Sequence, residues 1–256
     1  MPQVTERGTA PVELKIRSSK DWDDYFAQNE RELLCIPWED GASVTDREIA
    51  AIATSIQGFQ LGESSEGFHL SKCAKIYSER ANDAAYFDAM KRFIREEQRH
   101  ARDLARFMDL AGIAAIKKTW PDAVFRKLRH LADLEVSISV LITAEIIAKV
   151  YYPALREATA SPVLRTLCDQ IIHDEGPHVE FQAQRLAILR KNRGRIALQI
   201  RHGLHRFLFY GTCLVVWYKH GKAFKAGGKG FWAFWQTCWQ EFAVARRLMD
   251  PSTYEK

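Results

Sequence analysis

Apolar side chains recur at alternating steps of three and four residues along several stretches of this chain. That period places them on one face of an α-helix, which can then bury this face against other helices. One stretch shows the pattern over most of its length, and its stripe consists of Tyr86, Met90, Phe93, Glu97, His100, Leu104 and Phe107. The pattern predicts an all-α protein in which long helices pack around a common core.

Acidic residues interrupt the apolar stripes at matching places. In four stripes a glutamate occupies an inward position, and these residues are Glu63, Glu97, Glu145 and Glu175. A carboxylate buried without a partner costs several kcal/mol or shifts its pKa until it becomes neutral. Four such residues on four inward faces therefore indicate a common cation in the core.

Two of these glutamates are each followed by a histidine three residues later. The pairs are Glu97 with His100 and Glu175 with His178. Residues three apart lie on the same face of a helix, about one turn from each other, so each pair can hold one metal ion. A lone glutamate, Glu63 or Glu145, precedes each pair by roughly thirty residues. The arrangement predicts a duplicated half-site for two metals.

A single pair at this spacing is weak evidence, because any polar helix produces one. Glu66 and His69 are such an instance, and His69 lies about a third of a turn from Glu63, away from the apolar stripe. We therefore expect His69 at the surface. Two pairs on inward faces, each with an upstream glutamate, favour a dinuclear site over chance.

The segments "EEQRH" at 96–100 and "DEGPH" at 174–178 resemble the ligand motif of the ferritin-like di-iron carboxylate superfamily. In that family a lone Glu precedes Asp/Glu-Glu-x-Arg-His, and only Pro177 departs from the motif by replacing the arginine. The stretch "FQLGESSEG" is similar to the first helix of rubrerythrins, which favours Glu63 over Glu66 as the ligand. The resemblance covers roughly residues 45–192.

The resemblance implies a role for each motif residue. The family's ligands correspond here to Glu63, Glu97, His100, Glu145, Glu175 and His178. The two glutamates of the pairs would bridge the metals, the two upstream glutamates would be terminal ligands, and each histidine would bind one metal. Glu96 and Asp174 would accept hydrogen bonds from the histidine N–H groups and fix their tautomer. We also expect Arg99 and Tyr152 directly behind the ligands, and Glu66 is the alternative ligand.

We divide the chain into an N-terminal arm (1–44), a ferritin-like four-helix bundle (45–192) and a C-terminal two-helix extension (193–256). The arm is predicted to contain a short helix and an extended segment. Its apolar residues are expected to pack on the bundle, and they are Trp22, Tyr25, Phe26, Leu33, Leu34 and Trp38.

Capping residues locate the first two helices of the bundle. Thr45 and Glu48 form a capping box that begins the first helix, which is predicted to run to about Arg80 with Glu63 near its middle. Asn82 or Asp83 begins the second helix, and Gly112 ends it.

Prolines shape the other two helices. The segment 119–122 is predicted to open the third helix, which should kink or break near Tyr151, ahead of Pro153. The fourth helix is predicted to start at 161–162 and to run to about Asn192. Inside it, Pro177 costs roughly 3 kcal/mol in a regular helix, and the sequence leaves open whether it aims His178 or is a structural kink.

The composition is that of a globular protein, with 256 residues of which 47% are hydrophobic and 27% charged. Residues 1–10 contain no apolar run, so we expect no secretory signal. Five widely spaced cysteines without a Cys-x-x-Cys pair indicate a reduced, cytoplasmic protein. They also exclude the four-cysteine rubredoxin-type domain of full-length rubrerythrins.

The C-terminal region differs from the rest in charge. Residues 185–256 hold 14 Lys or Arg against 3 acids, although the net charge of the whole chain is only +5. This region is also aromatic and is predicted to form two helices joined by the loop 221–230. Its longest apolar run, 207–218, is too short to span a bilayer, which needs about 20 residues.

Two roles for this hairpin remain open. Its aromatic residues could simply pack across one end of the bundle. Alternatively, Lys219, Lys222, Lys225 and Lys229 could dock on an anionic membrane surface or on an acidic carrier such as acyl carrier protein. No recognised nucleic-acid-binding module appears, so we expect no nucleic-acid partner.

The favoured function is a non-haem di-iron oxidoreductase that uses O₂ or peroxide to oxidise a small-molecule or carrier-bound substrate, with an external electron donor. The residues do not distinguish two iron ions from a Mn/Fe pair, nor a monomer from a homodimer. The alternatives are a ferroxidase of the ferritin type and a membrane-surface or carrier-binding protein with a structural metal site.

Overall fold

The computed structural model describes residues 15–64, 67–117 and 133–254. The described part is all-α and contains no strand. The bundle consists of α2 (Asp46–Glu63) with α3 (Phe68–Ala81), α4 (Ala84–Leu110), α6 (Leu134–Glu157) and α7 (Pro162–Arg190). The arm supplies α1 (Ser19–Asn29) and the short helix η1 (Trp38–Asp40), and the extension supplies α8 (Arg195–Ala226), α9 (Phe231–Leu248) and η2 (Pro251–Thr253).

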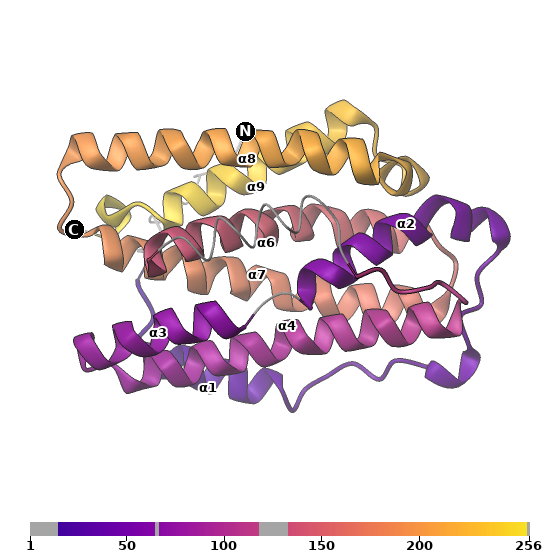
Figure 1. Cartoon of the computed structure of the whole chain (residues 1–256), viewed down its shortest axis with the longest axis horizontal. Helices are drawn as coiled ribbons and strands as arrows, with labels where there is room; N and C mark the ends of the chain where they lie inside the picture. Colours follow the sequence, from indigo (N-terminus) through magenta and orange to yellow (C-terminus); the bar gives the residue numbers. More distant parts are fainter. Residues whose placement is uncertain (1–14, 65–66, 118–132, 255–256) are drawn as a thin grey trace, which may run out of the picture.

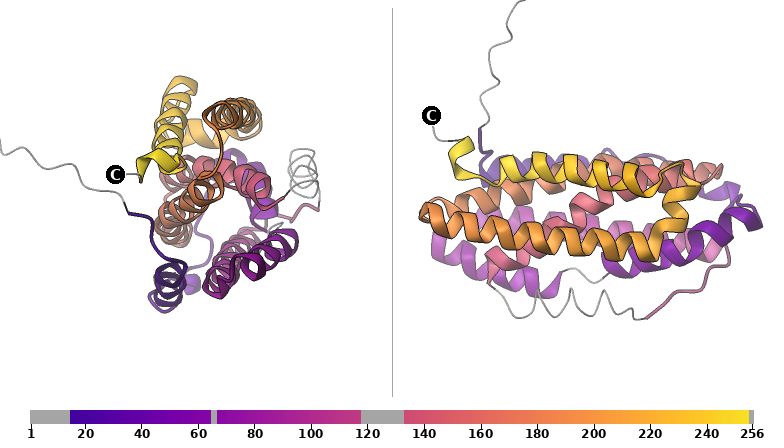
Figure 2. Two further views of the ribbon diagram at one scale, coloured as in Figure 1. Left: turned by 90° about the vertical axis from the view of Figure 1, so that its left-hand side faces the viewer. Right: turned by 90° about the horizontal axis from the view of Figure 1, so that it is seen from above.

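The helices run roughly along one long axis and lie in layers (Figure 1). The pair α6 and α7 forms the centre, with α3 and α4 on one side, and α2 contacts both α4 and α8. On the same side, α1 packs against α4. The other side of the central pair is covered by α8 and α9, which extend along the bundle (Figure 2).

Local capping agrees with the sequence at several boundaries. Thr45 and Glu48 form the predicted capping box, in which the Thr45 N–H donates to Glu48 Oε2 at 2.7 Å. Asp83 accepts from the Tyr86 N–H, while Gly112 has the left-handed φ of 67° that ends a helix. Ser161 accepts from the Leu164 N–H at the start of α7.

The first long helix is not continuous, contrary to the prediction. It ends at Glu63, and α3 begins at Phe68 after Gly67, whose φ of 138° only glycine adopts readily. The apolar period runs across this interruption, so it did not reveal the break. Glu63 therefore lies in the last turn of α2 instead of mid-helix.

The third helix also differs from its prediction. The predicted opening at 119–122 lies outside the described residues, and α6 begins at Leu134 behind the N-cap Asp133. No break occurs near Tyr151, because α6 continues through Pro153 to Glu157. Packing of α6 against α7 and α8 holds the helix together despite the hydrogen bond that proline cannot make. In the same way α7 remains helical through Pro177.

The C-terminal hairpin lies along the bundle and not across one end of it (Figures 1 and 2). Its first helix is longer than predicted, since α8 reaches Ala226 and only the turn from Gly227 to Gly230 separates it from α9. A polar contact links α8 to the bundle. The Ser55 hydroxyl of α2 lies 2.9 Å from both the Tyr151 hydroxyl of α6 and Nδ1 of His220 in α8.

Several aromatic and apolar residues are more exposed than the sequence suggested. Trp22 and Phe26 of α1 are buried as expected, but Leu33 and Leu34 are 43% and 47% exposed. Trp232 of α9 is 77% exposed and does not belong to the core. No helix in the described ranges is long and apolar enough to cross a membrane.

The close approach of the α8–α9 turn to α6 gives a test of this arrangement. A Cβ atom added at Gly227 would overlap the carbonyl oxygen of Ala154, so Gly227→Ala should destabilise the protein by about 1–3 kcal/mol, the usual cost of overpacking. Gly230→Ala is the matched control, because nothing lies within 4 Å of its added Cβ atom. Urea denaturation of both variants measures the difference, and equal stabilities would contradict this packing of the hairpin.

Candidate metal centre

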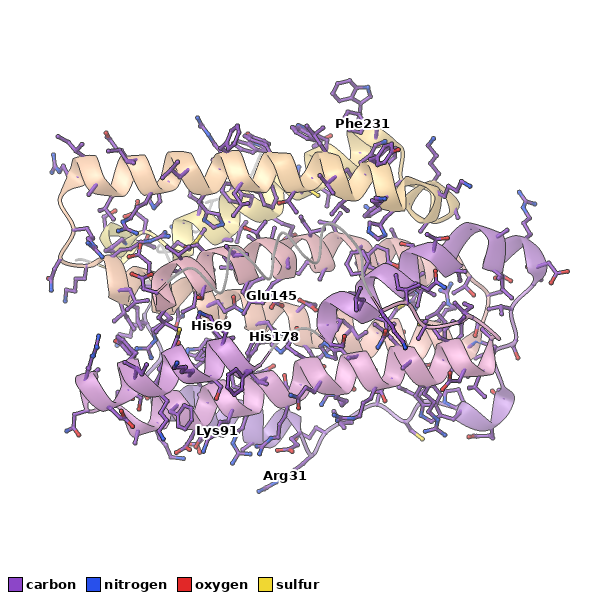
Figure 3. The ribbon with its side chains drawn as sticks, viewed as in Figure 1. Arg31, His69, Lys91, Glu145, His178 and Phe231 are labelled. Atoms are coloured by element: carbon purple, nitrogen blue, oxygen red, sulfur yellow. The ribbon has the colours of Figure 1, made fainter. Side chains whose placement is uncertain are left out.

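The six candidate ligands converge from four helices of the bundle. The last turn of α2 supplies Glu63, α6 supplies Glu145, and α4 and α7 each supply a glutamate and a histidine. Glu63 is 8% exposed and the other five at most 3%. Glu145 and His178 lie in the middle of the molecule, between α6 and α4 (Figure 3).

The ligand atoms form two groups that share one residue. Glu63, His100 and Glu175 make one group, in which the candidate ligand atoms all lie within 4.8 Å of one another. By the same criterion the other group consists of Glu97, Glu145, Glu175 and His178. Glu175 therefore occupies the position between two metal-sized sites.

Glu97 belongs to one of these groups, yet it lies close to the other. Its Oε1 atom is 3.0 Å from Nδ1 of His178 and 3.6 Å from Nδ1 of His100. This carboxylate oxygen therefore lies between the two imidazoles.

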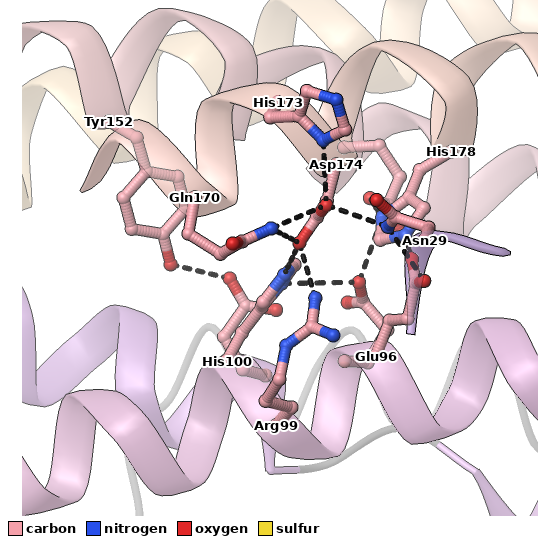
Figure 4. Close-up of polar contacts among 12 residues, drawn as sticks. Asn29, Glu96, Arg99, His100, Tyr152, Gln170, His173, Asp174 and His178 are labelled. Carbon is pink, nitrogen blue, oxygen red and sulfur yellow. Dashed lines mark hydrogen bonds and ion pairs between the residues drawn. The ribbon is translucent and has the colours of Figure 1, made fainter. Parts of the chain in front are cut away.

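Both histidines point Nδ1 into the site and Nε2 away from it. His100 Nε2 on α4 lies 2.9 Å from Asp174 Oδ2 on α7, and His178 Nε2 on α7 lies 2.9 Å from Glu96 Oε2 on α4 (Figure 4). A carboxylate accepts the Nε2–H and so leaves the Nδ1 lone pair directed at the site. The two contacts also link α4 and α7 in both directions.

Further polar side chains hold these two carboxylates in place. Asn29 of α1 donates to Glu96 Oε1 at 2.8 Å and to Asp174 Oδ1 at 2.9 Å, thereby joining the two halves (Figure 4). Gln170 donates to Asp174 from one turn earlier in α7, and Arg99 pairs with Asp174 Oδ2 at 2.5 Å. Asn29 and Gln170 were not among the predicted site residues, because neither lies in the ligand motif and Asn29 belongs to the arm.

Three further residues singled out in the sequence are Tyr152, Glu66 and His69. The Tyr152 hydroxyl donates to Glu63 Oε1 at 2.6 Å, which places it directly behind that carboxylate. Glu66 lies outside the described residues. His69 is half-buried, with Nε2 3.4 Å from the sulfur of Cys73, and belongs to neither group of candidate ligands.

The residues fit a pair of bound cations. Eleven buried side-chain atoms in the described ranges lack a well-formed hydrogen bond. Five of them belong to the candidate ligands, and these are Glu97 Oε1, His100 Nδ1, both carboxylate oxygens of Glu175, and His178 Nδ1. Buried polar atoms in folded proteins are nearly always paired, because leaving one unpaired costs free energy. All five belong to residues of the two groups and could act as metal ligands. Cations bound between them would therefore give each of these atoms a partner.

Electrostatics leads to the same conclusion. Burial, followed by repulsion from neighbouring glutamates, raises the pKa of Glu97 and of Glu175 well above the usual value. Burial also acts to raise the pKa of Glu145, but attraction to His178 and hydrogen bonding, such as that from Gln182, outweigh it and lower that pKa. The pKa of His178 is raised well above its usual value, because its carboxylate partners overcome the effect of burial. Without cations, protons must therefore neutralise part of the cluster.

The surroundings of the cluster are aromatic on one side and open toward solvent on another. The rings of Phe93 and Phe26 lie 4.7 and 6.0 Å from the His178 ring and keep water from it. Beyond Glu96, a surface cleft of about 320 Å³ opens among the arginines of α4, with Arg99 on its wall. Glu96, which accepts from His178, lines this cleft, and Arg99 on its wall pairs with Asp174.

Comparison with known structures agrees with this architecture. Two variants of an R2-like ligand-binding oxidase, each with an aerobically reconstituted Mn/Fe cofactor, share the fold. One aligns with a TM-score of 0.62 and 15% identity over 96% of this chain and 99% of that chain. The other aligns with a TM-score of 0.64 and 16% identity over 97% and 100%. No protein-family model matches the chain, and no curated protein matches it in sequence.

At these identities the likeness establishes the fold, which is ferritin-like and all-α as the sequence motif predicted. The alignment extends over nearly the whole chain.

The raised pKa values predict how the metal-free protein responds to pH. Glu97, Glu175 and His178 bind protons more tightly in the folded than in the unfolded chain, so the stability they contribute is present at low pH and lost as the pH rises through the raised values. Asp174 and Glu145 have lowered pKa values and act in the opposite sense, but the stability that they contribute is lost only at acidic pH, below about pH 6. Chelator-treated protein should therefore unfold at lower urea concentration at about pH 8 than at about pH 6.

The variant with Glu97→Gln and Glu175→Gln should flatten this dependence, since glutamine is neutral at both pH values. Glu79→Gln, which changes an exposed acid of α3, is the control. An unchanged pH dependence in the double variant would show that protonation of these two carboxylates does not cause the change in stability with pH.

Proposed function

We propose that this protein is a non-haem oxidoreductase that binds two redox-active metal ions and uses O₂ or peroxide to oxidise an organic substrate. The observation that carries the proposal is the set of five unpartnered, buried donor atoms arranged in two groups around Glu175. Mixed carboxylate and imidazole ligation from four helices suits iron and manganese. Two iron ions or a Mn/Fe pair would both satisfy the donor set.

In this proposal each metal has its own histidine. Glu63 and His100 would hold one ion, Glu145 and His178 would hold the other, and Glu175 would bridge them. Glu97 would be a second bridge, since its Oε1 lies near Nδ1 of both histidines.

When bound, the two ions would supply the electrons that reduce O₂ or peroxide. The protein's own residues would do the rest. Asp174 and Glu96 keep the imidazoles in the tautomer that presents Nδ1. Phe26 and Phe93 exclude water on the histidine side. Burial and the nearby Glu63 carboxylate raise the pKa of Tyr152 well above its usual value, so the hydroxyl keeps its proton and donates it in a hydrogen bond to Glu63 Oε1.

The extent of the structural likeness supports an oxidase over a ferritin-type ferroxidase. The matched oxidase structures align over 96% and 97% of this chain, which must include most of α8 and α9 beyond the four-helix bundle. A chain of cage-ferritin length would lack these two helices. Fold analogy alone does not identify a substrate. We therefore propose only the class, a small or carrier-bound organic molecule with an external electron donor.

Metal content tests the ligand assignment. Protein reconstituted anaerobically with iron should hold about two ions per chain, as the duplicated ligand set requires. Glu175→Ala and Glu97→Ala should each lower the content of both ions, because both residues are proposed to bridge. Glu66→Ala should leave it unchanged. Elemental analysis after desalting measures all four proteins, and loss of one ion only in both bridging variants would contradict the bridging roles.

Oxygen uptake tests the proposed reaction class. Reconstituted wild-type protein should change its optical spectrum on exposure to O₂ and should consume O₂ with a reductant, whereas the Glu175→Ala variant should do neither. Size-exclusion chromatography is run on the same sample. A 24-subunit shell that accumulates iron would favour the ferroxidase instead, and metal-loaded protein that is inert to O₂ and peroxide would indicate a structural metal site.

A further inference from the structure

The outer face of α8 carries a stripe of large apolar side chains that no other described element covers. They recur at helical spacing along the helix, and they are Ile196, Ile200, Leu204, Phe207, Leu214 and Tyr218. Phe207 and Tyr218 are 80% and 82% exposed. On the neighbouring α9, Trp232 adds an indole that is 77% exposed. We call this set the outer stripe.

The opposite face of α8 is already buried. Phe209, Cys213 and Phe224 are at most 1% exposed and belong to the hydrophobic core, because α8 packs on α2, α6 and α9. The helix is therefore apolar on two faces. A helix that is hydrophobic on more than one side is normally covered on each of them.

The charges of α8 restrict what can cover the outer stripe. Its 32 residues include no acid, and they include Arg195, Arg201, Arg206, Lys219, Lys222 and Lys225. Arg201 pairs with Glu135 of α6 at 3.0 Å. No ion pair joins the three lysines to an acid within the described ranges, and Lys222 and Lys225 continue the line of the outer stripe toward the helix end.

A second copy of this chain fits these charges poorly. A symmetric interface along α8 would bring two helices together that carry only positive charge, and like charges facing each other oppose association. An anionic lipid surface fits them well. Apolar and aromatic side chains can enter the boundary between headgroups and acyl chains, while lysines beside them pair with the headgroups.

The shape of this face also suits a planar surface. At about 1.5 Å per residue α8 spans roughly 48 Å. It lies beside α9 along one side of the molecule, the side marked by Phe231 in Figure 3 (Figures 2 and 3). We propose that the outer stripe and the lysines at the end of α8 dock this protein peripherally on an anionic lipid surface.

This proposal does not depend on the metal centre. The outer stripe lies on the far side of α6 from α4, and none of its residues is a candidate ligand. Vesicle binding should therefore be the same with and without chelator.

Cosedimentation of the full chain with vesicles tests the electrostatic part. Wild-type protein should pellet with vesicles that contain phosphatidylglycerol and should bind phosphatidylcholine vesicles much more weakly. Replacing Lys219, Lys222 and Lys225 by Gln should lower the partition coefficient by about a hundredfold at low salt, at about fivefold per lysine. The matched control replaces three exposed lysines outside α8 and α9, Lys72, Lys75 and Lys117, and should leave binding unchanged.

A second variant tests the apolar part. Phe207→Ser combined with Tyr218→Ser should retain the circular dichroism and melting temperature of the wild type, because both side chains are largely exposed. It should nevertheless weaken vesicle binding at high salt, where screening has removed most of the lysine contribution.

Four outcomes would overturn the proposal. The first is wild-type protein that stays in the supernatant with phosphatidylglycerol vesicles at low salt. The second is equal loss of binding in the two triple-lysine variants, which would show that only net charge matters. The third is protein that does not bind vesicles but forms a dimer in sedimentation velocity, which the serine changes dissociate. The fourth is capture by acyl carrier protein without vesicle binding.

Discussion

Like-charged carboxylates facing one another in a dry core impose the main constraint on this structure. Glu63, Glu97, Glu145 and Glu175 are each at least nine-tenths buried, and two of them resist ionisation because burial and their neighbours raise their pKa. Such an arrangement is unfavourable unless positive charge lies among the carboxylates. The unpartnered oxygens and imidazole nitrogens mark where that charge belongs. The rest of the bundle can be understood as the scaffold that keeps these atoms together.

The scaffold is stiffened by a second set of polar contacts that is symmetric between α4 and α7. Each histidine is held by an acid on the opposite helix, and Asn29 bridges the two acids. The α1 helix thus belongs to the site, although it lies outside the bundle. Because imidazole orientation depends on the group that accepts its second N–H, these contacts govern how Nδ1 meets a metal.

Both the core and the outer face of α8 contain groups that lack a partner within the described chain. Among the residues that the structure describes, several buried polar atoms of the core have no protein partner, and the large apolar side chains on the outer face of α8 have no protein cover. In both cases the chemistry of the exposed groups indicates the class of the missing partner. Carboxylates and imidazoles favour cations, and an apolar stripe with lysines and no acids favours an anionic, partly apolar surface.

The sequence by itself determined the features that arise from local interactions. Helical period, the capping box at Thr45, an N-cap at Asn82 or Asp83, and the spacing of the glutamate and histidine pairs depend on residues a few positions apart. They could therefore be predicted, and with them the all-α class, while the structure selected Asp83 as the cap. The inward placement of the six candidate ligands followed from the same periodicity. Contacts between distant segments could not be derived in this way.

Tertiary structure decided the rest. Only folding showed that α2 stops at Glu63, because the apolar period continues across the break at Gly67. Asn29 reaches Glu96 and Asp174 from far along the chain, and no local pattern encodes such a contact. The sequence left open whether the aromatic residues of the hairpin pack on the bundle, and only the packing of α9 showed that Trp232 is 77% exposed. The physical reason is that period and caps specify which face of a helix is apolar, whereas the packing of whole helices decides which of these faces finds a partner.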